Sequence, residues 1–218
     1  EKNKGRHASI STVDLQFLGI DVDQNMNGLM DKVISLASTY APLDGINDAG
    51  VSCGIYMTYQ GGDKTIATDQ NTDKPDFTST TLLRLILDYA DSVEEAVEIA
   101  SSYDLHDSAS TSYHYMVADS TGKSAILEWT GKNDASDNDG SQRTLKVIYN
   151  DQDEYIGKKE ANSDYQVVTN FVLQPGYYEA SNIKEKKGAD RYDRIYEELE
   201  KRNGIVADEN EAMNILSI

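Results

Sequence analysis

The 218-residue sequence has little cysteine and histidine, and few basic residues for its number of acidic ones. One cysteine, Cys53, excludes an intrachain disulfide and a cysteine-based zinc cluster. The histidines, His7, His106 and His114, are scattered without the spacing of a metal site. The 38 acidic and 20 basic residues give a formal net charge of −18, which argues against binding to nucleic acid or anionic membranes because both would repel the chain. No apolar run approaches the roughly 18 residues of a membrane helix, so we expect no helix of this chain to span a membrane.

The length suits one domain, residues 1–218, with enough chain to bury a core. Hydrophobic residues make up 39% of the chain, a modest share for a globular protein. The first residue is Glu1, with no methionine and no signal-like apolar segment, so we expect a processed or trimmed piece of a longer protein. The compartment, cytoplasmic or secreted, is left open because a targeting region would lie upstream.

Hydrophobic periodicity predicts both helices and strands. Apolar residues at helical spacing predict helices over 29–40, 80–89, 93–101 and 190–201, and Asp208 caps a last helix. Alternating or continuous apolar runs predict strands over 8–15, 51–59, 113–118, 124–129, 144–149 and 165–170, with turns at 44–45 and 48–50. Strands, then helices, then strands joined by hairpins indicate an α+β fold of layered antiparallel sheets.

Two Asp- and Asn-rich turns resemble parts of a calcium-binding loop. In 23–28 the first six positions fit, but the twelfth is Ile34 instead of a bidentate Glu. In 135–140 the first ligand position is Ala135 and the twelfth is Lys146. Such turns are common in acidic proteins, so we favour ordinary turns and expect neither a metal nor a cofactor. A calcium-stabilised domain stays a third alternative.

Two residues with reactive side chains are interpreted as structural. Cys53 lies within an apolar strand, and its neighbours in the sequence include no base or cation that would favour a thiolate. His114 alternates with the apolar positions of another predicted strand. We expect this histidine to bind backbone or carboxylate groups on a strand face instead of acting as a catalytic base.

Five segments carry motifs in a recognisable order: 44–53 (Asp-Gly-Ile-Asn-Asp-Ala-Gly-Val-Ser-Cys), 80–103, 112–129, 167–170 (Val-Val-Thr-Asn) and 188–192 (Gly-Ala-Asp-Arg-Tyr). The second contains Ser-Val-Glu-Glu-Ala, and the third is a hairpin that contains His114 and Glu128. Together they resemble the choloylglycine hydrolase family, which groups with penicillin V acylases and acyl-transferase-like amidases as linear amide C–N hydrolases. The resemblance covers most of residues 8–218.

This resemblance implies an N-terminal-nucleophile hydrolase, an αββα sandwich of antiparallel sheets that is incomplete here at both chain ends. In that family an N-terminal Cys attacks a linear amide, with its own α-amine as the base, and forms an acyl-enzyme. Asn170 would donate to the developing oxyanion, and Arg191 would hold positive charge near the sulfur. The second oxyanion position falls on Met57, whose thioether cannot donate, so a backbone N–H or Tyr56 would substitute. Outside a site, an Asn that ends a strand and an Arg that starts a helix are ordinary turn and surface residues.

The nucleophile and the Arg and Asp that follow it in the family are expected upstream of Glu1. The 218-residue chain alone is therefore expected to be inactive, and the small-molecule partner of the full-length protein would be an N-acyl amide. The alternative is a non-catalytic extracellular binding module on the same scaffold. Neither nucleic acid nor membrane is expected as a partner, and assembly into a homo-oligomer is left open.

Overall fold

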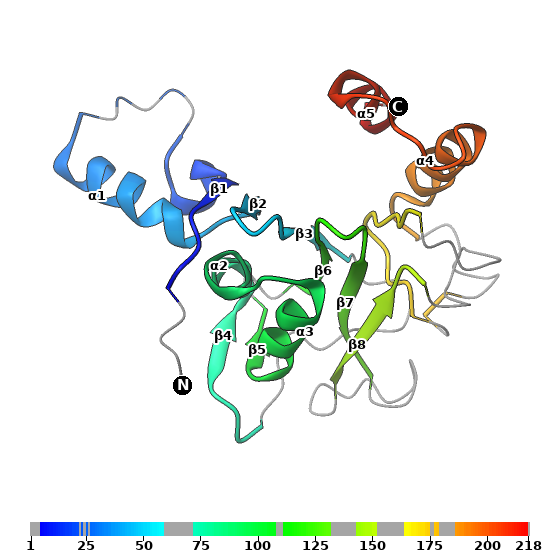
Figure 1. Cartoon of the computed structure of the whole chain (residues 1–218). Coiled ribbons are helices and arrows are strands. Elements are labelled where there is room, and N and C mark those ends of the chain that lie inside the picture. Colours follow the sequence, from blue (N-terminus) through cyan, green and yellow to red (C-terminus); the bar gives the residue numbers. More distant parts are fainter. Residues whose placement is uncertain are drawn as a thin grey trace.

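A single antiparallel sheet organises the structure. The computed structural model describes residues 5–21, 23, 25, 27–58, 72–107, 111–131, 143–151, 164–174, 177–178 and 186–217. Six strands pair in the order β1-β2-β3-β6-β7-β8 (Figure 1). They are β1 (Ser9–Thr12), β2 (Asp44–Asn47), β3 (Ser52–Met57), β6 (Tyr113–Ala118), β7 (Ser124–Thr130) and β8 (Thr144–Tyr149). Two short strands, β4 (Asp76–Thr78) and β5 (Asp104–His106), form a separate parallel pair.

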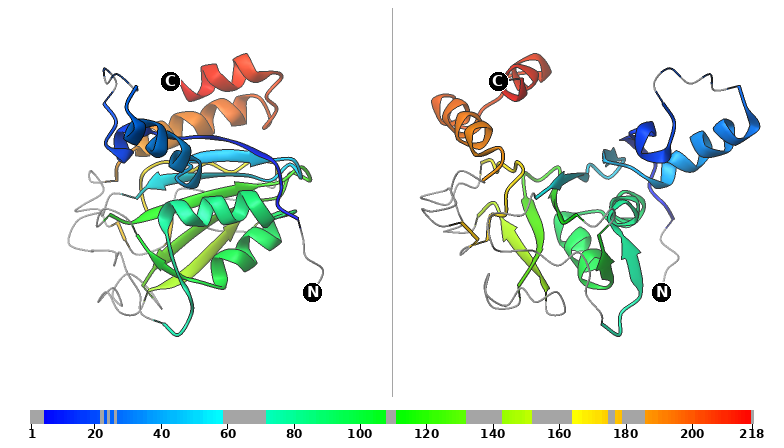
Figure 2. Two further views of the ribbon diagram at one scale, coloured as in Figure 1. Left: turned by 90° about the vertical axis from the view of Figure 1, so that its left-hand side faces the viewer. Right: turned by 180° about the vertical axis from the view of Figure 1, so that it is seen from behind.

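Helices α2 (Ser79–Tyr89) and α3 (Val93–Ser101) cover one face of the sheet (Figures 1 and 2). The N-cap Ser92 begins α3 by accepting a hydrogen bond from the backbone N–H of Glu95. The remaining helices are α1 (Leu29–Ala37), α4 (Ala189–Lys201) and α5 (Glu209–Leu216), with 3₁₀ turns at Leu15–Leu18 and Ser38–Tyr40. No helix in the described part of the chain combines the length and the apolar composition needed to traverse a bilayer.

Strand alternation divides the sheet between two cores. On β7, Leu127 and Trp129 pack with the buried residues of α2 and α3. Ile126, immediately before Leu127 in the sequence, points to the other face and packs with Phe171 and with Tyr192 of α4. All seven residues of β7 are buried, so this strand lies at the centre of the fold.

The helices at the two chain ends stand apart from each other. In Figure 1 and in the right-hand view of Figure 2, α1 lies at one end of the sheet and the α4–α5 pair at the other. None of the residues of α1 is buried, and its apolar side chains Leu29 and Leu36 are 78% and 75% exposed. The sheet face between these helices is therefore less covered than the face under α2 and α3.

Most predicted elements are confirmed, and the α+β class with an antiparallel sheet is correct. The predicted turn at 44–45 is wrong, because Asp44–Asn47 forms β2 and the chain turns only after Asn47. Gly45 fits within this strand because a Cβ there would lie 2.7 Å from the carbonyl oxygen of Ile10 and 2.9 Å from Leu87. The glycine thus allows β1, β2 and α2 to approach closely.

The predicted strand over 165–170 is also wrong, since this segment has no strand partner. Side chains on the sheet satisfy its backbone instead: a ring nitrogen of His114 binds the carbonyl of Thr169 at 2.7 Å. Gln166 anchors the start of the segment by donating to the carbonyl of Ile148 at 2.8 Å. The short strands β4 and β5 were not predicted, because three residues are too few to show alternation.

Candidate functional site

The four residues expected at the site, Tyr56, Met57, Asn170 and Arg191, lie at one end of β3. Asn170 Nδ2 donates to the carbonyl oxygen of Met57 at 2.9 Å, and Arg191 Nη2 donates to Asn170 Oδ1 at 2.7 Å. Met57 is the last residue of β3, and Arg191 lies in the first turn of α4. The fold thus joins residues that are 113 positions apart in the sequence, and it does so through a side-chain amide.

Both ends of the Asn170 amide are oriented by this contact chain. Arginine only donates hydrogen bonds, so the atom that faces Arg191 is the amide oxygen and the atom that faces Met57 is the nitrogen. An amide nitrogen carries two N–H groups, and the Met57 carbonyl accepts one of them. The second N–H has no recorded acceptor among the described residues. A fixed amide with an N–H to spare is suited to stabilising negative charge on a bound molecule.

Gly188 allows Arg191 to reach Asn170. This glycine is the N-cap of α4 and has a positive φ of 74°, a conformation that other residues adopt at a cost. A Cβ at Gly188 would lie 2.8 Å from Arg191 Nη2 and 3.2 Å from Thr169. Thr169 Oγ1 also donates to the Gly188 carbonyl at 3.1 Å. The start of α4 is therefore tied to the residue immediately before Asn170.

Tyr56 and Met57 contribute to the site in different ways. Met57 offers its carbonyl to Asn170, while its thioether cannot donate a hydrogen bond. Tyr56 lies back along β3, with its hydroxyl 3.2 Å from where a Cβ of Gly54 would be, and its ring makes an edge contact with His114 at 6.0 Å. Burial raises the pKa of the Tyr56 hydroxyl, so this group stays a neutral donor near neutral pH.

Tyr56 also lines an open hollow of about 420 Å³, which falls within the range of small-molecule sites. Its walls come mainly from β1, β2, β3 and β6, and the lining is more apolar than polar. The apolar side chains include Ile10, Ile46 and Met116. On β3 the hollow extends from Ser52 to Tyr56, so Tyr56 connects it to the candidate site, and its lining would suit an apolar group of a ligand.

A buried pair on neighbouring strands holds the segment that carries Asn170. His114 on β6 lies opposite Glu128 on β7, and the ring Nδ1 is 2.8 Å from Glu128 Oε1. The two side chains are 0% and 2% exposed. Glu128 also accepts the backbone N–H groups of Leu173, at 2.8 Å, and Gln174, at 3.1 Å. Because His114 holds the Thr169 carbonyl, the pair anchors the chain on both sides of Asn170.

The expectation for His114 as a structural residue is confirmed by these contacts. The role of Glu128 was not predicted, although a signal was present in the sequence. His114 and Glu128 are equidistant from Thr121 in the predicted hairpin, so antiparallel pairing places them opposite each other. A His and a Glu at paired, otherwise apolar positions indicate a buried hydrogen-bonded pair.

Cys53 is buried and faces away from this site. It is 5% exposed and packs with α2 and α3, where its sulfur lies 3.9 Å from the carbonyl of Leu83. Burial, reinforced by the negative charge of Asp44, raises the pKa of the thiol to about 12. Cys53 is therefore a structural residue, as expected. The predicted turn at 135–140 lies outside the described residues, and so do parts of the turn at 23–28.

A comparison with protein families gives a match over most of the chain. The family model of acyl-coenzyme A:6-aminopenicillanic acid acyl-transferase matches residues 33–204. No curated protein sequence matches the chain.

Solved structures resemble the chain at low sequence identity. A variant of conjugated bile acid hydrolase from Clostridium perfringens matches with a TM-score of 0.50 and 17% identity, over 81% of this chain and 58% of that one. Penicillin V acylase from Agrobacterium tumefaciens matches with a TM-score of 0.49 and 16% identity, over 83% of this chain and 52% of that one. A Caenorhabditis elegans N-acylethanolamine-hydrolyzing acid amidase ortholog matches with a TM-score of 0.47 and 17% identity, over 82% of this chain and 63% of that one. The chain thus spans less than two thirds of the length of each of these proteins, and its fold is similar to that of the bile acid hydrolase variant.

Glu128→Gln tests the anchoring pair. The substitution removes the negative charge of Glu128 and replaces one of its two acceptor oxygens with an NH2 group, so one of the backbone N–H groups of Leu173 and Gln174 loses its acceptor. We expect the free energy of unfolding to fall by about 3–5 kcal/mol in urea titration, as for a broken buried ion pair. The control is Glu94→Gln, which breaks a surface pair with Lys123 and should change stability little. Equal small losses in both variants would show that the buried pair is not an anchor.

Alkylation tests the state of Cys53. Near pH 9, the ordinary pKa of a thiol, a thiol with a pKa of about 12 stays protonated and reacts slowly. We expect iodoacetamide to modify Cys53 slowly in the folded chain and rapidly in urea, as measured by intact mass. Rapid modification of the folded chain under native conditions would contradict the buried assignment.

Proposed function

Because the chain belongs to the acyl-coenzyme A:6-aminopenicillanic acid acyl-transferase family, we propose that the full-length protein hydrolyses a linear amide C–N bond of an N-acyl amide. The reaction proceeds through a cysteine acyl-enzyme. The observation that carries this proposal is the chain of contacts from Arg191 through Asn170 to Met57. It supports a site built to stabilise negative charge at the end of β3.

The proposed nucleophile is an N-terminal cysteine outside the 218 residues. Cys53 does not fit this role, because it is buried under α2 and its thiol pKa is raised to about 12. The thiolate attacks the amide carbonyl, a C–S bond forms, and the carbonyl oxygen takes the negative charge. The C–N bond then breaks, and the amine leaves with a proton from the α-ammonium of the nucleophile. Water hydrolyses the thioester in the second half of the reaction.

Asn170 donates to the oxyanion in this mechanism. Its free N–H is held by the two contacts that fix the rest of the amide, so little reorganisation is needed when the charge develops. Arg191 keeps the Asn170 oxygen in place and supplies positive charge that favours the thiolate. Tyr56 and the backbone of Met57 contact the substrate, whose apolar acyl group enters the hollow beside β3.

Asn170→Ala in the full-length protein is the central test. We expect kcat to fall about 100-fold or more with little change in KM, because the donor acts mainly in the transition state. Bile salt conjugates, penicillin V and long-chain N-acyl amides form the substrate panel, and the released amine is measured. The control is Asn214→Ala, which removes an exposed amide from α5. An unchanged kcat in a folded Asn170→Ala protein would remove Asn170 from the site.

The same panel separates catalysis from binding alone. Mass spectrometry of the full-length protein should show an acyl adduct on the N-terminal peptide, and the 218-residue chain should be inactive. Turnover by that chain which Cys53→Ala abolishes would overturn both the mechanism and the structural assignment of Cys53. Binding of the amides with no turnover and no adduct would favour a non-catalytic binding module.

Replacement of Arg191 tests its charge. Lys keeps the charge and loses the planar guanidinium, whereas Gln loses the charge. A nearby cation lowers the pKa of a thiol, so we expect Arg191→Gln to shift alkylation of the N-terminal cysteine to higher pH and Arg191→Lys to shift it less. Arg194→Gln, one turn along the exposed side of α4, is the control. Identical pH profiles in all four proteins would leave Arg191 as a positioning residue for Asn170.

A further inference from the structure

Three potential metal ligands meet at the short parallel pair of strands, away from the candidate site. The register places Asp76 of β4 opposite Asp104 of β5, and Thr78 opposite His106. Phe77 and Leu105, the middle residues of the two strands, are buried in the core. Because side chains alternate along a strand, Asp76, Asp104 and His106 share the opposite face.

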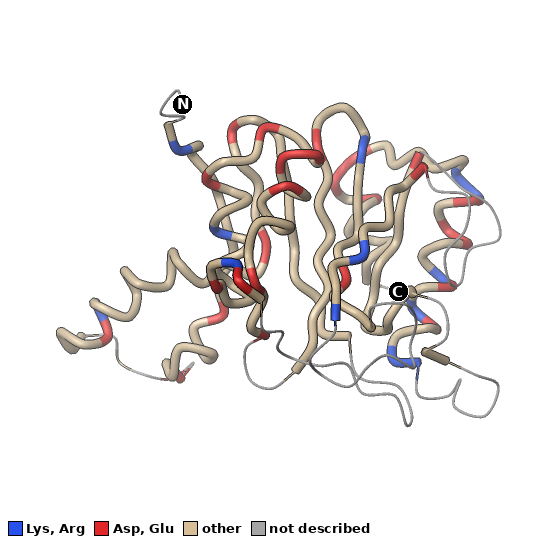
Figure 3. The backbone as a smooth tube through the Cα atoms, turned by 90° about the horizontal axis from the view of Figure 1, so that it is seen from below, with Lys and Arg blue, Asp and Glu red and all other residues tan. Residues whose placement is uncertain are grey.

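The donor atoms of these side chains converge. One carboxylate oxygen of Asp76, one of Asp104 and one ring nitrogen of His106 all lie within 4.8 Å of one another. His106 Nε2 is 3.2 Å from Asp76 Oδ1. That contact offsets part of the charge of Asp76 but leaves a second carboxylate beside it, in a chain with a net charge of −18. Figure 3 shows acidic positions spread over much of the described backbone, and an overall negative charge favours the approach of cations.

Asp104 provides an independent reason to place a cation here. The residue is 1% exposed, and its Oδ2 accepts the backbone N–H of Thr72 at 2.6 Å. Its Oδ1 is buried and has no hydrogen-bond partner among the described residues. A buried carboxylate oxygen without a partner is unfavourable, because the water that solvated it in the unfolded chain is not replaced. A metal ion would supply the missing interaction.

We propose that Asp76, Asp104 and His106 form a binding site for a divalent transition-metal ion, with Zn²⁺ as the best fit. Zinc accepts mixed imidazole and carboxylate ligands and is commonly held by three protein groups plus water. Calcium takes oxygen ligands only, in larger numbers, so the imidazole disfavours it. A bound ion would tie β4, and the Thr72 turn before it, to β5 at the edge of the α2–α3 layer.

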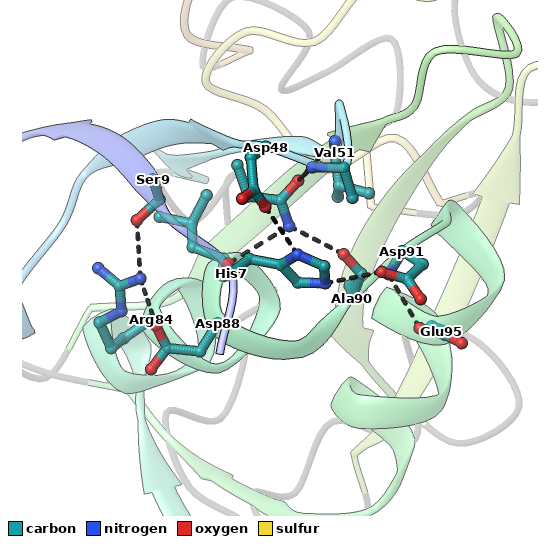
Figure 4. A network of polar contacts seen from close by, with 12 residues as sticks. His7, Ser9, Asp48, Val51, Arg84, Asp88, Ala90, Asp91 and Glu95 are labelled. Carbon is teal, nitrogen blue, oxygen red and sulfur yellow. Dashed lines mark hydrogen bonds and ion pairs between the residues drawn. The ribbon is translucent and has the colours of Figure 1, made fainter. Parts of the chain in front are cut away.

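The chain contains a natural comparison for this arrangement. His7 also lies between two carboxylates, with Nδ1 2.7 Å from Asp48 Oδ1 and Nε2 2.7 Å from Asp91 Oδ1 (Figure 4). The carboxylates approach opposite nitrogens of the ring, so one metal ion cannot contact all three side chains. Each of the two groups consists of one histidine and two aspartates. The donor atoms converge only in the group at β4–β5.

Calorimetry and thermal unfolding of the metal-free 218-residue chain test the proposal. We expect one Zn²⁺ to bind per chain, and the melting temperature to rise by about 5–10 °C when free Zn²⁺ is 100 times Kd. Asp76→Asn and His106→Gln should each weaken Zn²⁺ binding at least about tenfold. Their side chains are 69% and 39% exposed, so both variants should fold without metal. The matched control, His7→Gln, should bind Zn²⁺ as the unaltered chain does, and Ca²⁺ should give no melting shift.

Three outcomes would overturn the site. The first is no saturable Zn²⁺ binding to the unaltered chain. The second is equal affinity in the unaltered, Asp76→Asn and His106→Gln chains, which would place bound zinc elsewhere. The third is a loss of affinity in His7→Gln as large as in His106→Gln. Each of these results leaves the proposed amidase activity untouched, because the candidate site shares no residue with this group.

Discussion

The buried pair between His114 and Glu128 is the interaction on which the candidate site depends. It joins the neighbouring strands β6 and β7, and the remaining hydrogen-bonding atoms of both side chains bind the backbone of one irregular segment. A charged pair inside a protein is costly unless further hydrogen bonds complete it. Here Thr169, Leu173 and Gln174 supply those bonds, so the requirement to satisfy the pair also fixes the chain around Asn170.

The two faces of β3 explain why the cysteine and the site are separate. Cys53 points into the core under α2, while Tyr56 lines the hollow on the opposite face and Met57 ends the strand. One strand thus contributes to packing on one side and to ligand contact on the other, because its side chains alternate. The apolar environment that makes Cys53 a good core residue also raises its thiol pKa. Burial therefore explains both why Cys53 packs well in the core and why its thiol has a low reactivity.

Local signals in the sequence were sufficient for the regular elements. Ser92 and Glu95 marked the start of α3, and the 3.6-residue and two-residue periods located α2 and the β6–β7 hairpin. Asn170 and Arg191 were predicted by family resemblance, and no pattern within the sequence indicated that Arg191 would bind Asn170.

The segment 165–170 looked like a strand because its apolar residues do alternate. The segment is held by residues far away in the sequence, which local periodicity does not reveal: His114 binds the Thr169 carbonyl, and the Gln166 side chain donates to the Ile148 carbonyl. The Asp76, Asp104 and His106 group was missed for the same reason, since it depends on the parallel pairing of two very short strands.

The distance along the chain between Met57 and Asn170 has a consequence for the order of folding. The hydrogen bond between them closes a loop of 113 positions, and the His114–Thr169 contact closes one of 55. Contacts of such long range carry a large loop-closure entropy, so they form after the hairpin β6–β7 and the adjacent helices α2 and α3, whose contacts are local. A partly folded chain can therefore hold a formed central hairpin and helix layer while Asn170 is still unplaced. We therefore expect the candidate site to form late in folding, after the local elements are in place.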